Sequence, residues 1–84
     1  MLTLDKLNIY RRFDGDLDGW ARIANGHDAS GITYADWLLI EDLRQGLALI
    51  AAGQTSQTFT AALESHLLRT TADEATRQAL RALR

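Results

Sequence analysis

The chain has 84 residues and a net charge of −2. That length predicts a single helical domain over residues 1–84 and excludes a large enzyme with a deep cleft and a separate lid. The chain contains 14 Leu and 13 Ala but no Val, a composition that favours an all-α fold. Its content of 46% hydrophobic and 24% charged residues excludes a disordered tail and a membrane protein. The lack of Cys excludes disulfides, thiolate zinc sites and cysteine nucleophiles.

Glycine, and not proline, divides the chain, and the first predicted element is a helix at about 4–13 with Thr3 as its N-cap. An irregular segment rich in Asp and Gly is predicted at 14–33, with a short helix inside it at about 20–25. The inward side of the first helix is predicted to consist of Leu2, Ile9, Tyr10 and Phe13.

The longest predicted helix spans about 34–52. Thr33 and Asp36 form a variant of the Ser/Thr-x-x-Glu capping box before it, and Gly53 follows as its C′ residue. Gly46 falls on the core side, where its cost of about 1 kcal/mol relative to Ala is offset if another helix approaches closely. The main apolar face is predicted to hold Leu39, Ile40, Leu43, Leu47 and Ile50. The opposite face is predicted to hold Glu41, Arg44, Gln45 and Ala48.

A second, smaller apolar stripe on this helix contains Leu38 and Leu49. Two stripes indicate contact with more than one neighbour. The second stripe is buried either within the monomer or across a homodimer, and the pattern leaves both alternatives open.

Two further helices complete the plan, one at about 57–69 capped by Ser56 and one at about 72–84. Thr71 to Glu74 matches a full capping box for the last helix. The inward residues are predicted to be Phe59, Ala62, Leu63 and Leu67 in one helix and Ala75, Ala79, Leu80 and Leu83 in the other. The predicted fold is a compact bundle of four to five helices.

The most specific local motif is Asp14-x-Asp16-x-Asp18-Gly19, which resembles the first half of an EF-hand calcium loop. Alternate carboxylates would converge on one cation, joined by the backbone carbonyl of Trp20. The resemblance implies a weak Ca²⁺ site, because loop positions nine and twelve are Arg22 and Asn25 instead of ligands. The alternative is an ordinary turn, since Asp and Gly favour turns. No other cofactor is predicted.

The sequence carries no catalytic motif, and His27 and His66 do not match metal-ligand spacing, so we expect no enzyme activity. Arg77, Arg81 and Arg84 form a basic stripe on the last helix. This stripe is the basis of an alternative in which the protein binds nucleic acid, but cations also favour a helix C-terminus and need no ligand there.

Charge is unevenly distributed, with −4 on residues 1–42 and +2 on residues 43–84. The negative charge of residues 1–42 disfavours nucleic acid and favours a basic protein partner, and aromatic side chains beside charge are typical of interfaces. The same aromatics could instead cover the core. The candidate partner-binding residues are Asp14, Asp16, Asp18, Trp20, Asp28, Tyr34, Asp36 and Trp37.

The leading functional hypothesis is therefore a small protein-interaction or regulatory module, such as an accessory, inhibitor or immunity-type protein. The chain shows neither a signal peptide nor an apolar run of about 18 residues, so no membrane association is predicted and the expected location is the cytoplasm.

Overall fold

The protein is described by a computed structural model that places residues 1–13, 21 and 31–83. Within these residues the chain forms four helices and one isolated backbone bridge, and the predicted all-α fold is confirmed. The helices are α1 (Leu4–Phe13), α3 (Tyr34–Ala51), α4 (Gln57–Thr70) and α5 (Glu74–Arg81). The short helix expected at about 20–25 lies, apart from Ala21, outside the described residues.

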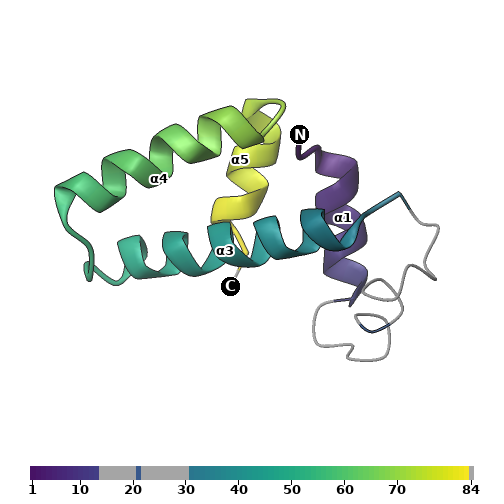
Figure 1. The fold of residues 1–84 in the computed structure, drawn as a ribbon, viewed down its shortest axis with the longest axis horizontal. Helices are drawn as coiled ribbons and strands as arrows, with labels where there is room; N and C mark the ends of the chain where they lie inside the picture. The colour runs from purple at the N-terminus through teal and green to yellow at the C-terminus, as the bar shows by residue number, and fades with distance from the viewer. Residues whose placement is uncertain (14–20, 22–30, 84) are drawn as a thin grey trace.

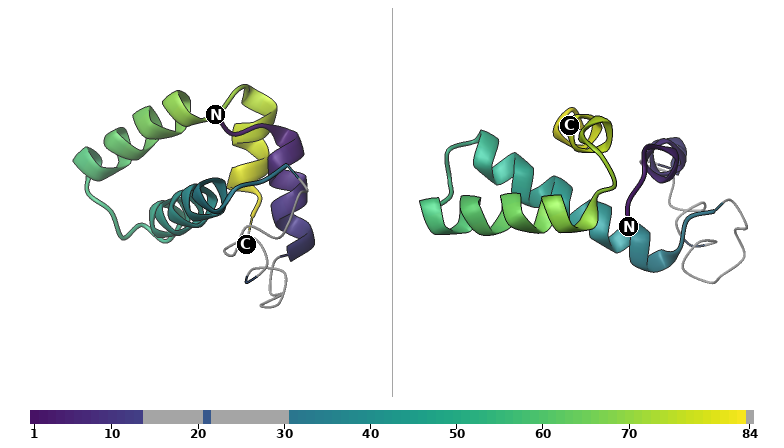
Figure 2. Two further views of the ribbon diagram at one scale, coloured as in Figure 1. Left: turned by 45° about the vertical axis from the view of Figure 1, so that its right-hand side comes forward. Right: turned by 90° about the horizontal axis from the view of Figure 1, so that it is seen from above.

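The helices are arranged in two layers (Figure 1). Helices α3 and α4 form an antiparallel hairpin, and α1 and α5 lie side by side behind it, crossing α3 steeply. The view from above in Figure 2 shows α1 and α5 on one side of the hairpin. The closed end of the hairpin extends past α5, so that half of it belongs to the front layer alone.

The core lies where α1, α3 and α5 meet the end of α4. Its two largest side chains are Tyr10 and Trp37, whose ring centroids are 4.7 Å apart. The buried apolar residues are Leu2, Leu7, Tyr10, Ile32, Trp37, Ile40, Leu43, Leu67 and Leu80. The apolar patterns of the first and central helices identified four of these core members, Leu2, Tyr10, Ile40 and Leu43. Leu7 was not among the residues predicted to face inward, and a core position for Trp37 was one of two alternatives left open.

The inward faces predicted for the last two helices need correction. Phe59 and Ala62 are exposed, because no helix of the back layer reaches their end of the hairpin. On α5 the buried side is centred on Thr76 and not on Ala75, which is exposed. Thr76 tolerates burial because its hydroxyl donates to Asp73 Oδ1 at 2.7 Å.

Both predicted ends of α3 are confirmed. The Thr33 hydroxyl accepts from the Asp36 N–H at 3.1 Å, and Asp36 Oδ2 accepts from the Thr33 N–H at 3.1 Å, which completes the capping box. At the other end Gly53 has φ +70°. Its N–H donates to Ile50 O, and the following N–H donates to Leu49 O, both at 3.0 Å, which is a Schellman motif.

The predicted start of the last helix is wrong. Asp73, and not Thr71, is the N-cap of α5, and the helix begins at Glu74 instead of about 72. The backbone bridge at Leu2 explains the difference: Leu2 N–H donates to Thr70 O at 2.7 Å, and Ala72 N–H donates to Leu2 O at 2.9 Å. This pairing holds the backbone around Thr71 extended, so its hydroxyl bonds back to Leu67 O instead of capping α5.

Gly46 lies where the hairpin helices touch, as its core-side position predicted. It is buried, and a Cβ atom at this position would lie 2.8 Å from Cδ2 and 3.1 Å from Cδ1 of Leu63. The glycine therefore allows α4 to approach α3 closely enough for Leu63 to rest on the α3 backbone.

We expect Leu2→Ala to lower the free energy of unfolding by about 2–5 kcal/mol, because Leu2 is fully buried and its removal leaves a cavity in the core. Leu4→Ala is the matched control: Leu4 is 38% exposed, and its replacement should cost less than about 1 kcal/mol. Urea unfolding of both variants measures the difference. Equal losses would contradict the role given to Leu2.

The contact at Gly46 predicts coupling between two substitutions. In a Leu63→Ala background, Gly46→Ala should stabilise the protein by about 1 kcal/mol through helix propensity. In the wild-type protein the same change should give no such gain, because Leu63 must move. A double-mutant cycle by urea unfolding measures this coupling, and an equal gain in both backgrounds would disprove the contact.

Candidate functional site

The predicted calcium ligands and most of the predicted partner-binding acids cannot be placed. These residues, which lie outside the described part of the chain, are Asp14, Asp16, Asp18, Trp20 and Asp28. In residues 1–13, 21 and 31–83, no group of three or more His, Cys, Asp or Glu side chains is arranged to hold a metal ion. Of the predicted site residues, Tyr34, Asp36 and Trp37 lie in the described part of the chain.

Tyr34 and Trp37 have different environments although they are one helical turn apart. Trp37 is only 2% exposed and packs against Tyr10 and Phe13, with ring centroids 4.7 and 6.3 Å away. Tyr34 is 41% exposed at the first position of α3. Of the two alternatives for these aromatics, Trp37 has the core position, while Tyr34 presents its ring at the surface.

Asp36 fastens the start of α3 to α1. Its carboxylate completes the capping box with Thr33 and forms an ion pair with Lys6, with Oδ2 3.2 Å from Nζ. Partial burial opposes ionisation, but the hydrogen bond from Thr33 and the Lys6 ammonium favour the carboxylate, so the pKa of Asp36 lies below its ordinary value. Asp36, which was predicted to bind a partner, therefore has a structural role within the chain.

A polar cluster of Tyr10, Glu41 and Arg44, which was not predicted from the sequence, joins α1 to α3. The Tyr10 hydroxyl donates to Glu41 Oε1 at 2.5 Å and accepts from Arg44 Nη1 at 3.0 Å. Glu41 and Arg44 were predicted to lie on the outward face of their helix, but α1 covers this side and leaves both only partly exposed. Two features of the sequence could have indicated this cluster: the opposite charges of Glu41 and Arg44, three residues apart, and the position of Tyr10 on the apolar side of its helix.

The environment of Tyr10 determines its protonation. Burial and the hydrogen bond to Glu41 raise its pKa from 10.0 to about 12. At neutral pH the phenol therefore stays protonated, and its O–H donates a hydrogen bond to Glu41. The cluster is suited to fixing the position of α1 on α3, and not to supplying a base or a nucleophile.

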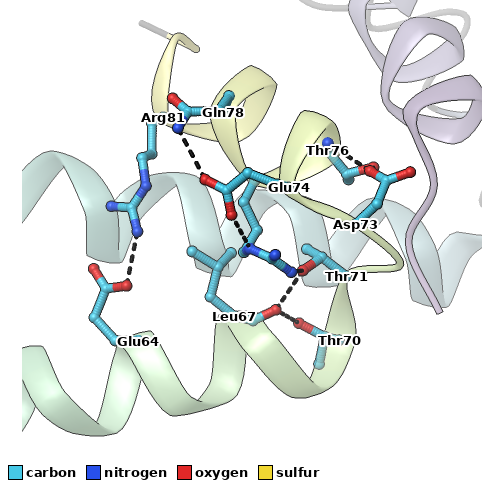
Figure 3. A network of polar contacts seen from close by, with 10 residues as sticks. Glu64, Leu67, Thr70, Thr71, Asp73, Glu74, Thr76, Gln78 and Arg81 are labelled. Carbon is cyan, nitrogen blue, oxygen red and sulfur yellow. Dashed lines mark hydrogen bonds and ion pairs between the residues drawn. The ribbon is translucent and has the colours of Figure 1, made fainter.

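The described members of the arginine stripe bind carboxylates of the same chain. Arg77 Nε lies 2.9 Å from Glu74 Oε2, and its Nη1 donates to the Thr71 hydroxyl at 3.2 Å. Figure 3 shows Arg81 reaching from α5 to Glu64 on α4, where Nη2 lies 2.7 Å from Oε2. Arg84 is outside the described residues. The Arg81 pair connects α5 to α4, the Arg77 pair lies within α5, and both partly neutralise the stripe that suggested nucleic-acid binding.

The front of the hairpin is left uncovered by α1 and α5. It holds four of the exposed large apolar residues, Tyr34, Leu38, Leu49 and Phe59. Leu49 lies about 60° from Gly46 around α3, and Phe59 lies about 40° from Leu63 around α4. Because the helices run antiparallel, these offsets put both side chains on the same side of the hairpin. Leu47, about 160° from Leu49, faces the core and α5 instead.

This uncovered face has two parts of different composition. Tyr34, Leu38 and Asp42 follow one another at intervals of four residues on the first half of α3, and all three are exposed. We call them the acidic half. Residues 45–63, which we call the hairpin tip, contain no Asp, Glu, Lys or Arg. This uncharged run is visible in the sequence and could have indicated an unusual surface at the hairpin tip.

A hollow of about 400 Å³ lies on the opposite side of α3, between its last turns and the end of α5. Apolar side chains form most of its lining, and its one charged lining residue, Arg81, is paired with Glu64. The lining residues are Leu47, Ala48, Ala51, Ala52, Arg81 and Leu83.

Comparisons with protein-family models, with curated proteins and with solved structures gave no match. None of the helices in the described part of the chain is long and apolar enough to cross a membrane. The function is therefore inferred from the geometry and charge of this chain.

We expect Tyr10→Phe to lower the free energy of unfolding at neutral pH by about 1–3 kcal/mol, because it removes hydrogen bonds to two charged groups. The raised pKa adds a pH dependence. The stability that the phenol contributes is complete below its ordinary pKa of 10.0 and is lost as the pH rises toward about 12.

Urea unfolding at about pH 9 and about pH 11 tests this dependence. The wild-type protein should lose more stability over this interval than the Tyr10→Phe variant. Parallel losses in the two proteins would show that Tyr10 does not carry the raised pKa.

Proposed function

We propose that the protein is a small protein-interaction module of regulatory or accessory kind that binds a basic protein through the acidic half of the uncovered face. The exposure of Tyr34 and Leu38, 41% and 42%, carries the proposal. Single exposed apolar side chains are common on protein surfaces and need no explanation. These two are neighbours on one helical face, so they form a contiguous apolar surface beside the acidic Asp42.

The surroundings of this pair fit an interface. Tyrosine is enriched at binding surfaces because it combines a large apolar ring with a polar end and few rotatable bonds. The acidic half continues directly from residues 14–33, and the first 42 residues carry a net charge of −4. A basic partner would be attracted by this charge and then make contact with the apolar pair.

This arrangement favours binding over catalysis as the activity of the protein. An inhibitor or immunity-type protein, the narrower form of the proposal, would act by covering a basic surface that its partner uses for another ligand. Such a role needs a stable fold, an exposed contact surface and a charge opposite to that of the partner.

Replacing Tyr34 and Leu38 together with Ala should weaken partner binding by roughly 30- to 700-fold, because each truncation at the centre of an interface costs about 1–2 kcal/mol. Leu68→Ala is the matched control, since Leu68 is 60% exposed on α4 and lies outside the acidic half. Its binding should equal that of the wild-type protein.

The measurement is quantitative co-purification from lysate of the native cells at about 0.15 M salt and again at higher salt, followed by titration of the recovered partner. The proposal expects a basic partner whose capture decreases with salt. Recovery of no partner, or equal recovery by the double variant, would reject it.

A further inference from the structure

The uncovered face of the hairpin tip is an exposed surface that the monomer leaves unused. Gly46 is the only buried residue between positions 45 and 63. Leu49 and Phe59 are 43% and 41% exposed, and neither belongs to the core cluster or to the residues packed against it. The side chains that the tip presents on its uncovered face therefore do not stabilise the monomer's core.

The tip also differs from an ordinary solvated surface in its charge. A protein surface commonly contains about a quarter or more of charged residues, and the whole chain has 24%. Residues 45–63 have none, although most of them are exposed. The neighbouring charges, Arg44 and Glu64, lie just beyond the two ends of this stretch, and each has a partner within the chain.

We propose that the hairpin tip binds a second copy of this chain, with the Leu49 and Phe59 parts of two uncovered faces packed against each other around a two-fold axis and the acidic half of each copy outside the contact. The product is a layer of four helices at the centre of the dimer. Helices α1 and α5 of each copy lie on the outside, since they cover only the back of each hairpin.

Charge is the first reason for choosing a second copy. A partner with charged side chains at this surface would lose their hydration and find no opposite charge among residues 45–63. A surface of the same composition has no charges to desolvate. In a two-fold dimer each patch meets itself, so an uncharged patch avoids the like-charge contacts that self-association otherwise creates.

The available area is the second reason. A stable interface buries roughly 800 Å² on each partner, which is about 15% of the 5247 Å² accessible surface of this chain. The tip comprises almost a quarter of the residues and is largely exposed. Leu49 and Phe59 supply large apolar side chains, and the small residues between them allow two helices to approach closely.

Sedimentation velocity and equilibrium on the full chain, from about 1 μM to about 1 mM, test the proposal. We expect reversible association to twice the 9.3 kDa mass of one chain. Leu49→Lys and Phe59→Lys should each raise the dimer dissociation constant roughly 30-fold or more, the effect of disrupting a central contact. Leu68→Lys, which adds the same charge at a more exposed site outside the tip, should leave it unchanged.

Circular dichroism of each variant establishes that it remains folded, and Leu49→Gln with Phe59→Gln provides a milder pair of changes with the same expected direction. A wild-type chain that stays monomeric over the whole range overturns the proposal, whether or not the tip captures another protein. Dimers that tolerate both lysine variants, or that Leu68→Lys weakens equally, also overturn it.

This dimer is independent of the proposed binding of a basic protein. The variant with Tyr34 and Leu38 replaced should dimerise normally while failing to bind the basic partner, and the Phe59→Lys variant should do the reverse. Failure of one proposal therefore leaves a result that differs from failure of the other.

Discussion

The backbone bridge between Leu2 and Thr71 is the contact on which the rest of the arrangement depends. It joins the first residues of the chain to the junction of α4 and α5, with the Leu2 N–H and C=O both hydrogen-bonded to the residues on either side of Thr71. The Leu2 side chain is fully buried in the same place. The bridge thereby holds the beginnings of α1 and α5 next to each other, so the two helices descend side by side behind the hairpin (Figure 1).

This placement determines which surfaces of the hairpin remain open. Because α1 and α5 are fixed to each other, both lie on one side of α3 and neither reaches the closed end of the hairpin. Apolar residues that a larger bundle would bury, such as Leu49 and Phe59, stay at the surface. The two proposed interaction surfaces follow from the same constraint and differ only in charge.

Polar contacts reinforce the arrangement instead of forming a reactive site. Tyr10 binds Glu41 and Arg44 where α1 crosses α3, and Arg81 binds Glu64 where α5 approaches α4. Directional contacts of this kind select one way of docking a helix among several that apolar packing alone would permit. Residues that a pattern assigns to solvent, such as Glu41 and Arg44, become part of an interface between helices.

The sequence by itself determined the features that depend on near neighbours in the chain. The capping box at Thr33, the cap at Ser56, the glycine end at Gly53 and the close approach at Gly46 all follow from local hydrogen bonding, backbone freedom or helical periodicity. Only the tertiary structure decided the burial of Trp37, the partners of Glu41 and the start of α5. Each of these depends on a residue from a distant part of the chain, because Leu2 and Tyr10 act on segments that periodicity cannot connect to them. The division of the candidate surface into an acidic half and an uncharged tip depends on both the sequence and the tertiary structure. The sequence gives the positions of the charges, and the packing of α1 and α5 determines which face of the hairpin stays exposed.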